Sequence, residues 1–503
     1  MSEQILEDVL YTTGKFFDTG FEFPVEQEIL LADYDAPVFK IVRTAVQHII
    51  TQKYINGGKL TIEGFFKITV YYQPPAGANL TVISKKLPFQ KQFDVPSDVQ
   101  SPYFITVGGE IQYVNTRAVN PARIDIRGVY RFTVKGYCRQ KISVGTAINS
   151  TSVCTDSEEL SHFSLCGRGT RQFSTEDELS LQGELDKILD ISANNVNMNV
   201  QIYSDKVNVK GEISTEIVYT LEGSAQIHRQ TKNYMYNQVI DVAGVTENNV
   251  AYADMNIISF TVTQSPETNR INCMATMQLD VKVFRKMSVI AVTDAFSQEY
   301  EYSKALYKLT YDSNIQSIYK KISVTVEDTI GSGYETAHCF VSAANPIMTT
   351  SDGNPVLRSK VSTAVIVRNT AGEYECFIKS EDAVINTGAP VLMENEYILA
   401  VYPGECTVNI SGEKMTVKAD LIITGFEICR ETVNTVQDFK EDCEKPVNTN
   451  KDALVLYYGK KGEKIFDIAL RYRTDTGLIL SENSLESKVL EEDRMLFIPV
   501  FRQ

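Results

Sequence analysis

The sequence contains no tryptophan and only four histidines among its 503 residues. Sugar-binding platforms often stack on tryptophan, and histidine is the commonest general base and metal ligand. Apolar runs are short and interrupted by polar residues, well below the roughly 20 residues that span a bilayer. These absences argue against a lectin, against a metal site and against insertion in a membrane.

The nine cysteines form no CxxC pair and are odd in number. Such a pattern is typical of reduced thiols in a reducing compartment. The first eight residues contain three acidic and no basic side chains, and they lack the basic start and apolar run of a secretory signal. We therefore expect a cytoplasmic protein with neither a disulfide framework nor a zinc knuckle.

Basic residues are also under-represented: 49 lysines and arginines face 64 aspartates and glutamates, which gives a formal net charge of −15. A surface for nucleic acid or anionic lipid needs clustered basic residues to neutralise phosphate. The charge predicts a partner that is a protein or a neutral polymer, and no nucleic acid.

Catalytic and cofactor motifs are missing, among them GxSxG, HExxH and the dinucleotide-binding glycine fingerprint. His338 beside Cys339 pairs a base with a thiol, but neighbours in a strand point to opposite faces and are poorly placed to exchange a proton. We predict no catalytic residue, no cofactor and no metal, hence no enzyme. The alternative, an enzyme of another type, requires a histidine or paired carboxylates converging in a deep pocket.

An internal repeat organises the chain, which is too long for a single hydrophobic core. Gly64 aligns with Gly211 and Tyr72 with Tyr219, an offset of 147 residues that holds for about 85 residues without a gap. Apolar and polar side chains alternate in both copies, as in half-buried strands. The two glycines take inward positions, which indicates a bulge or a close backbone approach.

A third, looser copy runs through residues 361–367 and 415–423. The sequence thus predicts a mainly β protein with three repeated antiparallel domains, sandwich or barrel-like, at 23–146, 170–293 and 318–432. The stretches between the copies are interpreted as linkers or added strands. Before them, residues 1–22 predict an amphipathic helical arm, with Ile5 and Val9 on one face, either packed on the first domain or free to dock. Residues 433–452 predict a linker.

The last fifty residues change pattern: a strand-like run is followed by Ile465, Ile468, Ala469 and Tyr472 at helical spacing. Together with Asp467 before Ile468-Ala469 and the closing run 495–499, this segment resembles a LysM domain. The resemblance implies a small α+β domain of β-α-α-β order at 453–503.

LysM domains typically bind N-acetylglucosamine polymers between the loop after the first strand and the loop before the second. In this sequence Glu463-Lys464 replaces the usual Asp-Thr, and the second loop carries three adjacent carboxylates. Such a loop attracts a basic protein patch more than a neutral sugar. We expect the groove to bind a protein, with a glycan as the alternative. The resemblance places this groove at Gly462, Glu463, Lys464, Ile465, Asn483, Val489, Leu490, Glu491, Glu492 and Asp493.

The repeated strand 206–219, its counterpart 58–64 and the LysM-like end resemble the SPOCS-domain spore-coat morphogenetic proteins of endospore-forming bacteria. The resemblance implies a structural adaptor in the mother-cell cytoplasm that links coat proteins to the forespore surface. Its terminal module would bind a coat-basement ATPase of the SpoIVA type in place of a sugar. The alternative is a cell-wall protein whose LysM-like module binds peptidoglycan or another N-acetylglucosamine polymer.

Overall fold

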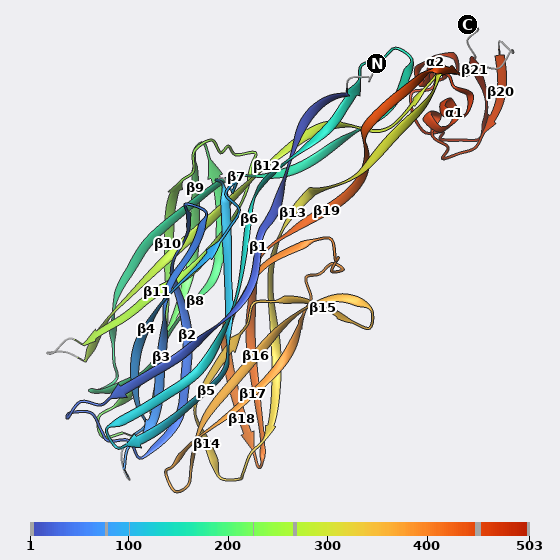
Figure 1. Cartoon of the computed structure of the whole chain (residues 1–503). Coiled ribbons are helices and arrows are strands. Elements are labelled where there is room, and N and C mark those ends of the chain that lie inside the picture. The colour runs from blue at the N-terminus through green and yellow to red at the C-terminus, as the bar shows by residue number, and fades with distance from the viewer. Residues whose placement is uncertain are drawn as a thin grey trace.

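The computed structural model describes residues 5–75, 79–99, 101–224, 226–264, 269–447 and 454–499. The described chain is built mainly from antiparallel strands, as predicted, and its two helices both lie after residue 464. Figure 1 shows the strands gathered in a broad body, from which the longest strands run on into a narrow extension. A small module with the two helices lies at the end of that extension.

Repeat 1 is a pair of antiparallel three-stranded sheets, ordered β1-β6-β5 and β2-β3-β4. Apolar side chains of both sheets meet in one core, including Leu60 and Ile62 on one side and Ile124 and Ile126 on the other. Two sheets that bury one face each against the other form a sandwich. The strands are β1 (Ile5–Leu30), β2 (Lys40–Asn56), β3 (Lys59–Gln73), β4 (Thr81–Asp94), β5 (Tyr103–Asn120) and β6 (Arg123–Ile148).

Repeat 2 has the same order, with sheet β11-β12-β7 packed against sheet β10-β9-β8. Val207 and Val209 of one sheet and Leu279 and Val281 of the other are fully buried between them. The same alternation of apolar and polar residues therefore builds the same sandwich twice. The strands are β7 (Val153–Ser180), β8 (Leu185–Tyr203), β9 (Lys206–Leu221), β10 (Ile227–Asp241), β11 (Val250–Gln264) and β12 (Arg270–Ser297).

Repeat 3 keeps this order with one interruption. Two strands, β14 and β15, pair along the same edge of β16 and together take the place that β2 has in repeat 1. The looser third copy predicted through 361–367 and 415–423 corresponds to β16 and β19. The strands are β13 (Tyr300–Thr329), β14 (Tyr334–Ala343), β15 (Ile347–Ser351), β16 (Asn354–Asn369), β17 (Tyr374–Ile385), β18 (Glu396–Ser411) and β19 (Lys414–Pro446).

The inward glycines of the two copies lie opposite bulges in β2 and β8. A Cβ on Gly64 would lie 2.2 Å from the carbonyl oxygen of Ile49, and one on Gly211 would lie 2.4 Å from that of Asn197. Those distances are too short for any side chain, so the backbone would have to move. The predicted bulge and close backbone approach are confirmed in both copies.

The three repeats share a core in the body. In each repeat, the sheet that does not continue into the stalk contributes to one shared buried cluster. The three repeats are therefore not separated by solvent in this part of the body. The fully buried members of the cluster are Tyr71 and Leu80 of repeat 1, Leu189 and Val218 of repeat 2, and Ile366 and Tyr374 of repeat 3.

The narrow extension, named the stalk, consists of three two-stranded ribbons in which β1 pairs with β6, β7 with β12 and β13 with β19. The ribbons pack together through buried residues from all three repeats, among them Leu10, Leu160 and Leu309. The chain passes from one repeat to the next at the stalk tip, through residues 149–152 and 298–299. The stalk comprises 5–15 with 138–148, 153–165 with 284–297, and 300–313 with 429–446.

The predicted helical arm is wrong over its described part, because residues 5–22 belong to strand β1. Ile5 and Val9 are four residues apart, a spacing that places two side chains on one face of a helix but also on one face of a strand. The ladder to β6 decides between the two. Residues 1–4 lie outside the described residues.

The predicted linker at 433–452 is also wrong over its described part, since residues 433–446 continue β19. A bulge at Gln437, between the pairs Ala305–Asp438 and Leu306–Val436, breaks the alternation that would have revealed the strand. Residues 448–452 lie outside the described part of the chain. The stretches between the copies are strands, and the repeats extend over 5–148, 153–297 and 300–446.

The C-terminal module has the order β-α-α-β that the sequence predicts. Ile465, Ile468 and Ala469 of the first helix are buried against Leu496 and Ile498 of the second strand. The carboxylate of Asp475 caps the second helix by accepting a hydrogen bond from the Leu478 amide at 3.0 Å. The elements are β20 (Leu454–Gly459), α1 (Ile465–Tyr472), α2 (Thr476–Glu482) and β21 (Arg494–Pro499).

Candidate functional site

The module is seated on the stalk tip by its helical side. The rings of Phe466 on α1 and Phe296 on β12 meet edge to face with centroids 5.3 Å apart. Arg473 donates a hydrogen bond of 2.6 Å to the carbonyl oxygen of Ser297, and its guanidinium lies over the ring of Tyr302 at 5.0 Å. Residues of the stalk therefore complete the module's core.

The two loops of the predicted groove lie side by side, and their backbones bond to each other. The Gly462 amide donates to the Leu490 carbonyl at 2.8 Å, and the Leu490 amide donates to the Glu463 carbonyl at 2.9 Å. The Ile465 amide donates to the Lys488 carbonyl oxygen at 2.9 Å. The structure thus brings the loops together, but these backbone groups already have partners and do not point to a ligand.

Three of the ten predicted groove residues belong to the interior of the module. Ile465 and Leu490 are core side chains. Asn483 is buried and ties α2 to β21: its side-chain amide donates to the carbonyl oxygens of Ile479 and Phe497, and its side-chain oxygen accepts from the Phe497 amide at 2.7 Å. Their assignment to a binding surface is wrong, because each is covered by the fold.

The other seven lie at the surface, in different environments. The Glu463 carboxylate turns inward and accepts hydrogen bonds from the Tyr457 hydroxyl and the Lys460 amide. The ammonium group of Lys464 lies 3.8 Å from the carboxylate of Asp156 in the stalk. Gly462 has a φ of +89°, a conformation that favours glycine.

The acidic loop forms the rim beside the start of β21. Asp493 accepts a hydrogen bond of 2.8 Å from the Lys461 amide, which leaves Glu491 and Glu492 as the outward carboxylates. Val489 is exposed on the same loop. Whether these residues bind a partner stays a prediction.

The outer face of the β20-β21 sheet carries exposed apolar residues that were not among the predicted site residues. Leu456 pairs across it with Phe497, and Tyr458 pairs with Met495. All four side chains are about half exposed, at 59, 47, 56 and 53%. The sequence contains a signal for this exposed face. Nearly every residue of the two strands is apolar or aromatic, and such strands place apolar side chains on both faces of a sheet. We name these four residues the sheet face.

His338 and Cys339 point apart, as predicted for neighbours in a strand. Arginine can only donate, so the 2.7 Å contact from Arg229 fixes His338 Nδ1 as acceptor and places the proton on Nε2. That nitrogen lies 3.7 Å from Asp190, and burial lowers the pKa of His338, which keeps the imidazole neutral. Cys339 faces the other way, with Sγ 2.6 Å from Sγ of Cys406. His338 joins repeats 2 and 3 and has no thiol beside it to activate.

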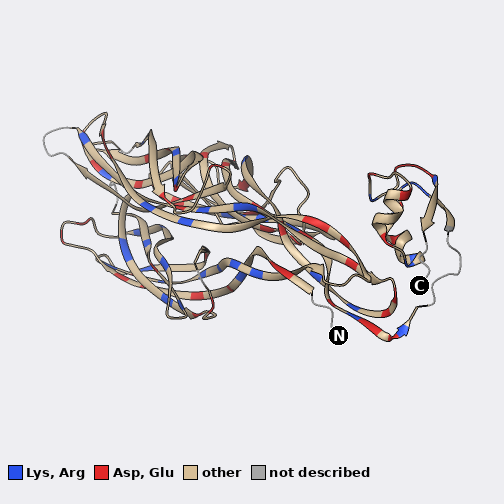
Figure 2. Cartoon of the chain, turned by 90° about the horizontal axis from the view of Figure 1, so that it is seen from above, with Lys and Arg blue, Asp and Glu red and all other residues tan. Residues whose placement is uncertain are grey.

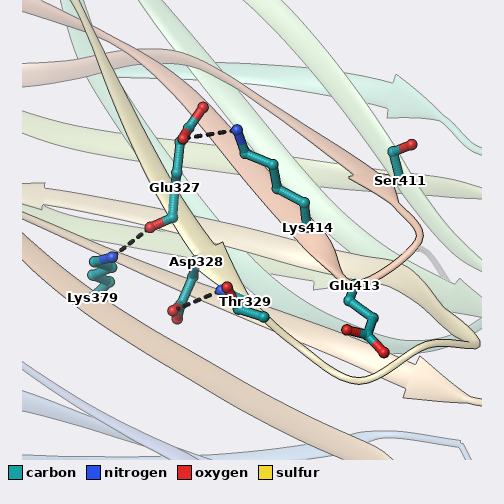
Figure 3. A pocket seen from close by; sticks show the side chains of 7 residues that line it. All are labelled: Glu327, Asp328, Thr329, Lys379, Ser411, Glu413 and Lys414. Carbon is teal, nitrogen blue, oxygen red and sulfur yellow. Dashed lines mark hydrogen bonds and ion pairs between the residues drawn. The ribbon is translucent and has the colours of Figure 1, made fainter.

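A hollow of about 510 Å³ lies at the end of repeat 3 that is remote from the stalk. Figure 3 shows its two lysines turned toward Glu327: Lys414 Nζ lies 2.8 Å from the carboxylate of Glu327, and Lys379 bonds to the backbone carbonyl of Glu327. Both lysines of the hollow are thus held by partners within the protein.

Charge is mixed over the whole molecule. Figure 2 shows basic and acidic residues interspersed along the strands of the body and the stalk. Among the described residues no three metal-ligating side chains gather, and neither helix is long and apolar enough to cross a bilayer.

Comparison with known families identifies two segments. Residues 37–119 and 184–264 both match the family described as SipL, SPOCS domain. The first segment includes β2 to β4 and most of β5, and the second includes β8 to β11, so the matches fall on equivalent parts of repeats 1 and 2. No curated protein and no solved structure matches the chain. Two segments of the chain, one in each of the first two repeats, are thus similar to the SPOCS domain of the SipL family.

Proposed function

We propose that this protein is a non-enzymatic adaptor of the spore coat, located in the mother-cell cytoplasm at the forespore surface. Its LysM-like module binds a coat-basement ATPase of the SpoIVA type, and its three repeats hold other coat proteins in place. The observation that carries the proposal is the pair of SPOCS-domain matches, because SipL-family membership points to spore-coat morphogenesis.

The shape of the molecule supports a connecting role. The stalk separates the module from the body, and the ribbons that form it are continuous with the sheets of all three repeats (Figure 1). A binding module at the end of such a stalk reaches one partner while the body remains free to contact others.

The arrangement of the two loops argues against a sugar as the ligand of the module. Bound sugars are oriented by a few precisely placed polar groups. Here the facing backbone groups of both loops bond to each other, and the Glu463 carboxylate is bonded within the module. The outward carboxylates Glu491 and Glu492 instead suit a basic protein surface.

Binding of the full chain to three purified ligands tests this function: the coat-basement ATPase, chitin oligomers and peptidoglycan. A chain ending at residue 447 serves as the matched control, because it keeps the repeats and lacks the module. We expect ATPase binding that the shortened chain loses, and no glycan binding by either. Glycan binding without ATPase binding would contradict the proposal and favour a cell-wall role.

A further inference from the structure

We infer that the sheet face, and not the groove between the loops, is the surface on which the module binds its protein partner, and that the occupant is a short apolar segment of that partner. This inference rests on the proposed function and names the surface that performs it. The sheet face consists of Leu456, Tyr458, Met495 and Phe497.

The sheet face lies away from the stalk. The module contacts the tip on its helical side. Phe466 of α1 packs on Phe296, and Arg473, which follows α1, donates to the carbonyl oxygen of Ser297. The hydroxyl of Thr476 in α2 is hydrogen-bonded to the thiol of Cys154. Both views show the strands β20 and β21 on the side of the module opposite this seat (Figures 1 and 2). A partner thus reaches the sheet face without displacing the module.

The composition of the sheet face is that of an interface core. Two aromatic residues, a methionine and a leucine form two adjacent cross-strand pairs, and aromatic residues and methionine are enriched where proteins bind each other. Exposed lysines 460 and 461 lie beyond the end of β20, and Glu491 and Glu492 lie before β21. The sheet face therefore has an apolar centre with a charged rim of both signs at one end.

The size of the sheet face selects the kind of occupant. A stable dimer of two copies requires about 800 Å² from each partner. Four half-exposed side chains supply only part of that area, although they suffice for the apolar residues of one strand or one helical turn. Among the described residues each strand of this two-stranded sheet pairs only with the other, and an extended segment can add hydrogen bonds at the outer edge that this leaves. These features favour a segment of a different protein over a second copy of this chain.

The test compares four forms of the full chain for binding to the purified coat-basement ATPase by isothermal titration calorimetry. They are the wild type, the double variant Leu456→Ser with Phe497→Ser, the loop variant Glu491→Gln with Glu492→Gln, and the control Met235→Ser. Met235 lies on β10 of repeat 2 and is 76% exposed, so its substitution removes an equally accessible apolar side chain elsewhere. Circular dichroism and thermal melting confirm that each variant is folded.

We expect the sheet-face variant to lose affinity at least tenfold and the control to bind as the wild type does. The loop variant should mainly change the salt dependence of association. Wild-type affinity in the sheet-face variant, with a loss in the loop variant, would overturn the inference and return binding to the groove. A wild-type chain that does not bind the ATPase would overturn the proposed function and this inference with it.

Sedimentation velocity of the same variants addresses a second copy as occupant. We expect the wild-type chain and the sheet-face variant to sediment alike. A wild-type dimer that dissociates when Leu456 and Phe497 are replaced would overturn the inference in favour of self-association.

Discussion

At the scale of single residues, a buried ion pair joins repeats 1 and 2. The Asp280 carboxylate on β12 is buried and lies 3.0 Å from the ammonium of Lys53 on β2. Burial by itself raises the pKa of a carboxyl group, but the attraction of Lys53 and of the neighbouring Lys282 outweighs it and lowers the pKa of Asp280 to about 2. The charged form is therefore favoured in the folded protein.

This lowered pKa predicts loss of stability in acid. An unfolded aspartate has a pKa of about 3.9, so the folded state gains from Asp280 above that pH and loses the gain as the pH falls through about 4 to 2. We expect the free energy of unfolding to drop by roughly 2 kcal/mol over this window because of Asp280. Urea unfolding at pH 5 and pH 2.5 measures it.

The matched variants are Asp280→Asn, which should lack this part of the acid sensitivity, and Asp438→Asn at an exposed carboxylate of the stalk, which should retain it. Equal acid sensitivity of the wild type and Asp280→Asn would show that the pair does not couple the repeats.

A second residue-scale prediction concerns Gly64. The Cβ of Gly64→Ala would meet the Ile49 carbonyl at 2.2 Å, whereas that of Gly20→Ala would have its nearest neighbour at an ordinary 3.5 Å. We expect Gly64→Ala to lower the free energy of unfolding by about 1–3 kcal/mol, as overpacking does, and Gly20→Ala to have little effect. Chemical denaturation compares them, and equal effects would mean that the backbone of β2 yields at no cost.

At the scale of elements, an aromatic contact is the main apolar part of the seat of the module. Phe296 of β12 is fully buried, and its ring packs against that of Phe466 on α1. We expect Phe296→Ala to weaken docking by about 3 kcal/mol through loss of buried apolar surface. Hydrogen exchange of the α1 amides should then accelerate while exchange in the body stays unchanged.

Ile290→Ala is the control for this prediction, because Ile290 lies on the same strand and is 55% exposed. Unchanged α1 exchange in Phe296→Ala would mean that the module is held by its other contacts.

How far the sequence predicts these elements depends on how strictly apolar and polar residues alternate. In the body, Leu60, Ile62 and their equivalents in repeat 2 alternate without interruption, so the strands and the repeat are visible. In the stalk, two-stranded ribbons leave much of each strand exposed, and the bulge at Gln437 puts Val436 and Phe439 on the buried side at an odd spacing. No local pattern marks such a strand, because its partner lies more than a hundred residues away.

The candidate site likewise has features that the sequence predicts and features that depend on the folded structure. The order of the module follows from helical spacing and strand runs that are contiguous in the sequence. The burial of Asn483 depends on its bonds to Phe497, and the pairing of Gly462 with Leu490 depends on the closed fold. A list of loop residues cannot distinguish those that hold the loop from those that face outward.

At the scale of the whole molecule, the shared clusters predict that the three repeats unfold together. One cluster in the body and one in the stalk contain buried residues of all three. We expect a single calorimetric transition for the repeats, with a calorimetric enthalpy close to the van't Hoff value.

His338→Ala should shift that transition downward by a few degrees without splitting it, because His338 joins repeats 2 and 3 through Arg229. Leu392→Ala, at a half-exposed position of repeat 3, is the control. Separate transitions in the wild type would show that the clusters do not couple the repeats.

The stalk has a mechanical consequence. Strand β19, which precedes the module in the chain, pairs with β13 along the stalk and on through the body. A pulling force on the module directed along the stalk acts parallel to these strands and perpendicular to their hydrogen bonds. The bonds are then loaded in shear, all at once, and do not open one after another as in a peeled hairpin. A protein held between two surfaces by this stalk would resist tension along its length far better than tension across it.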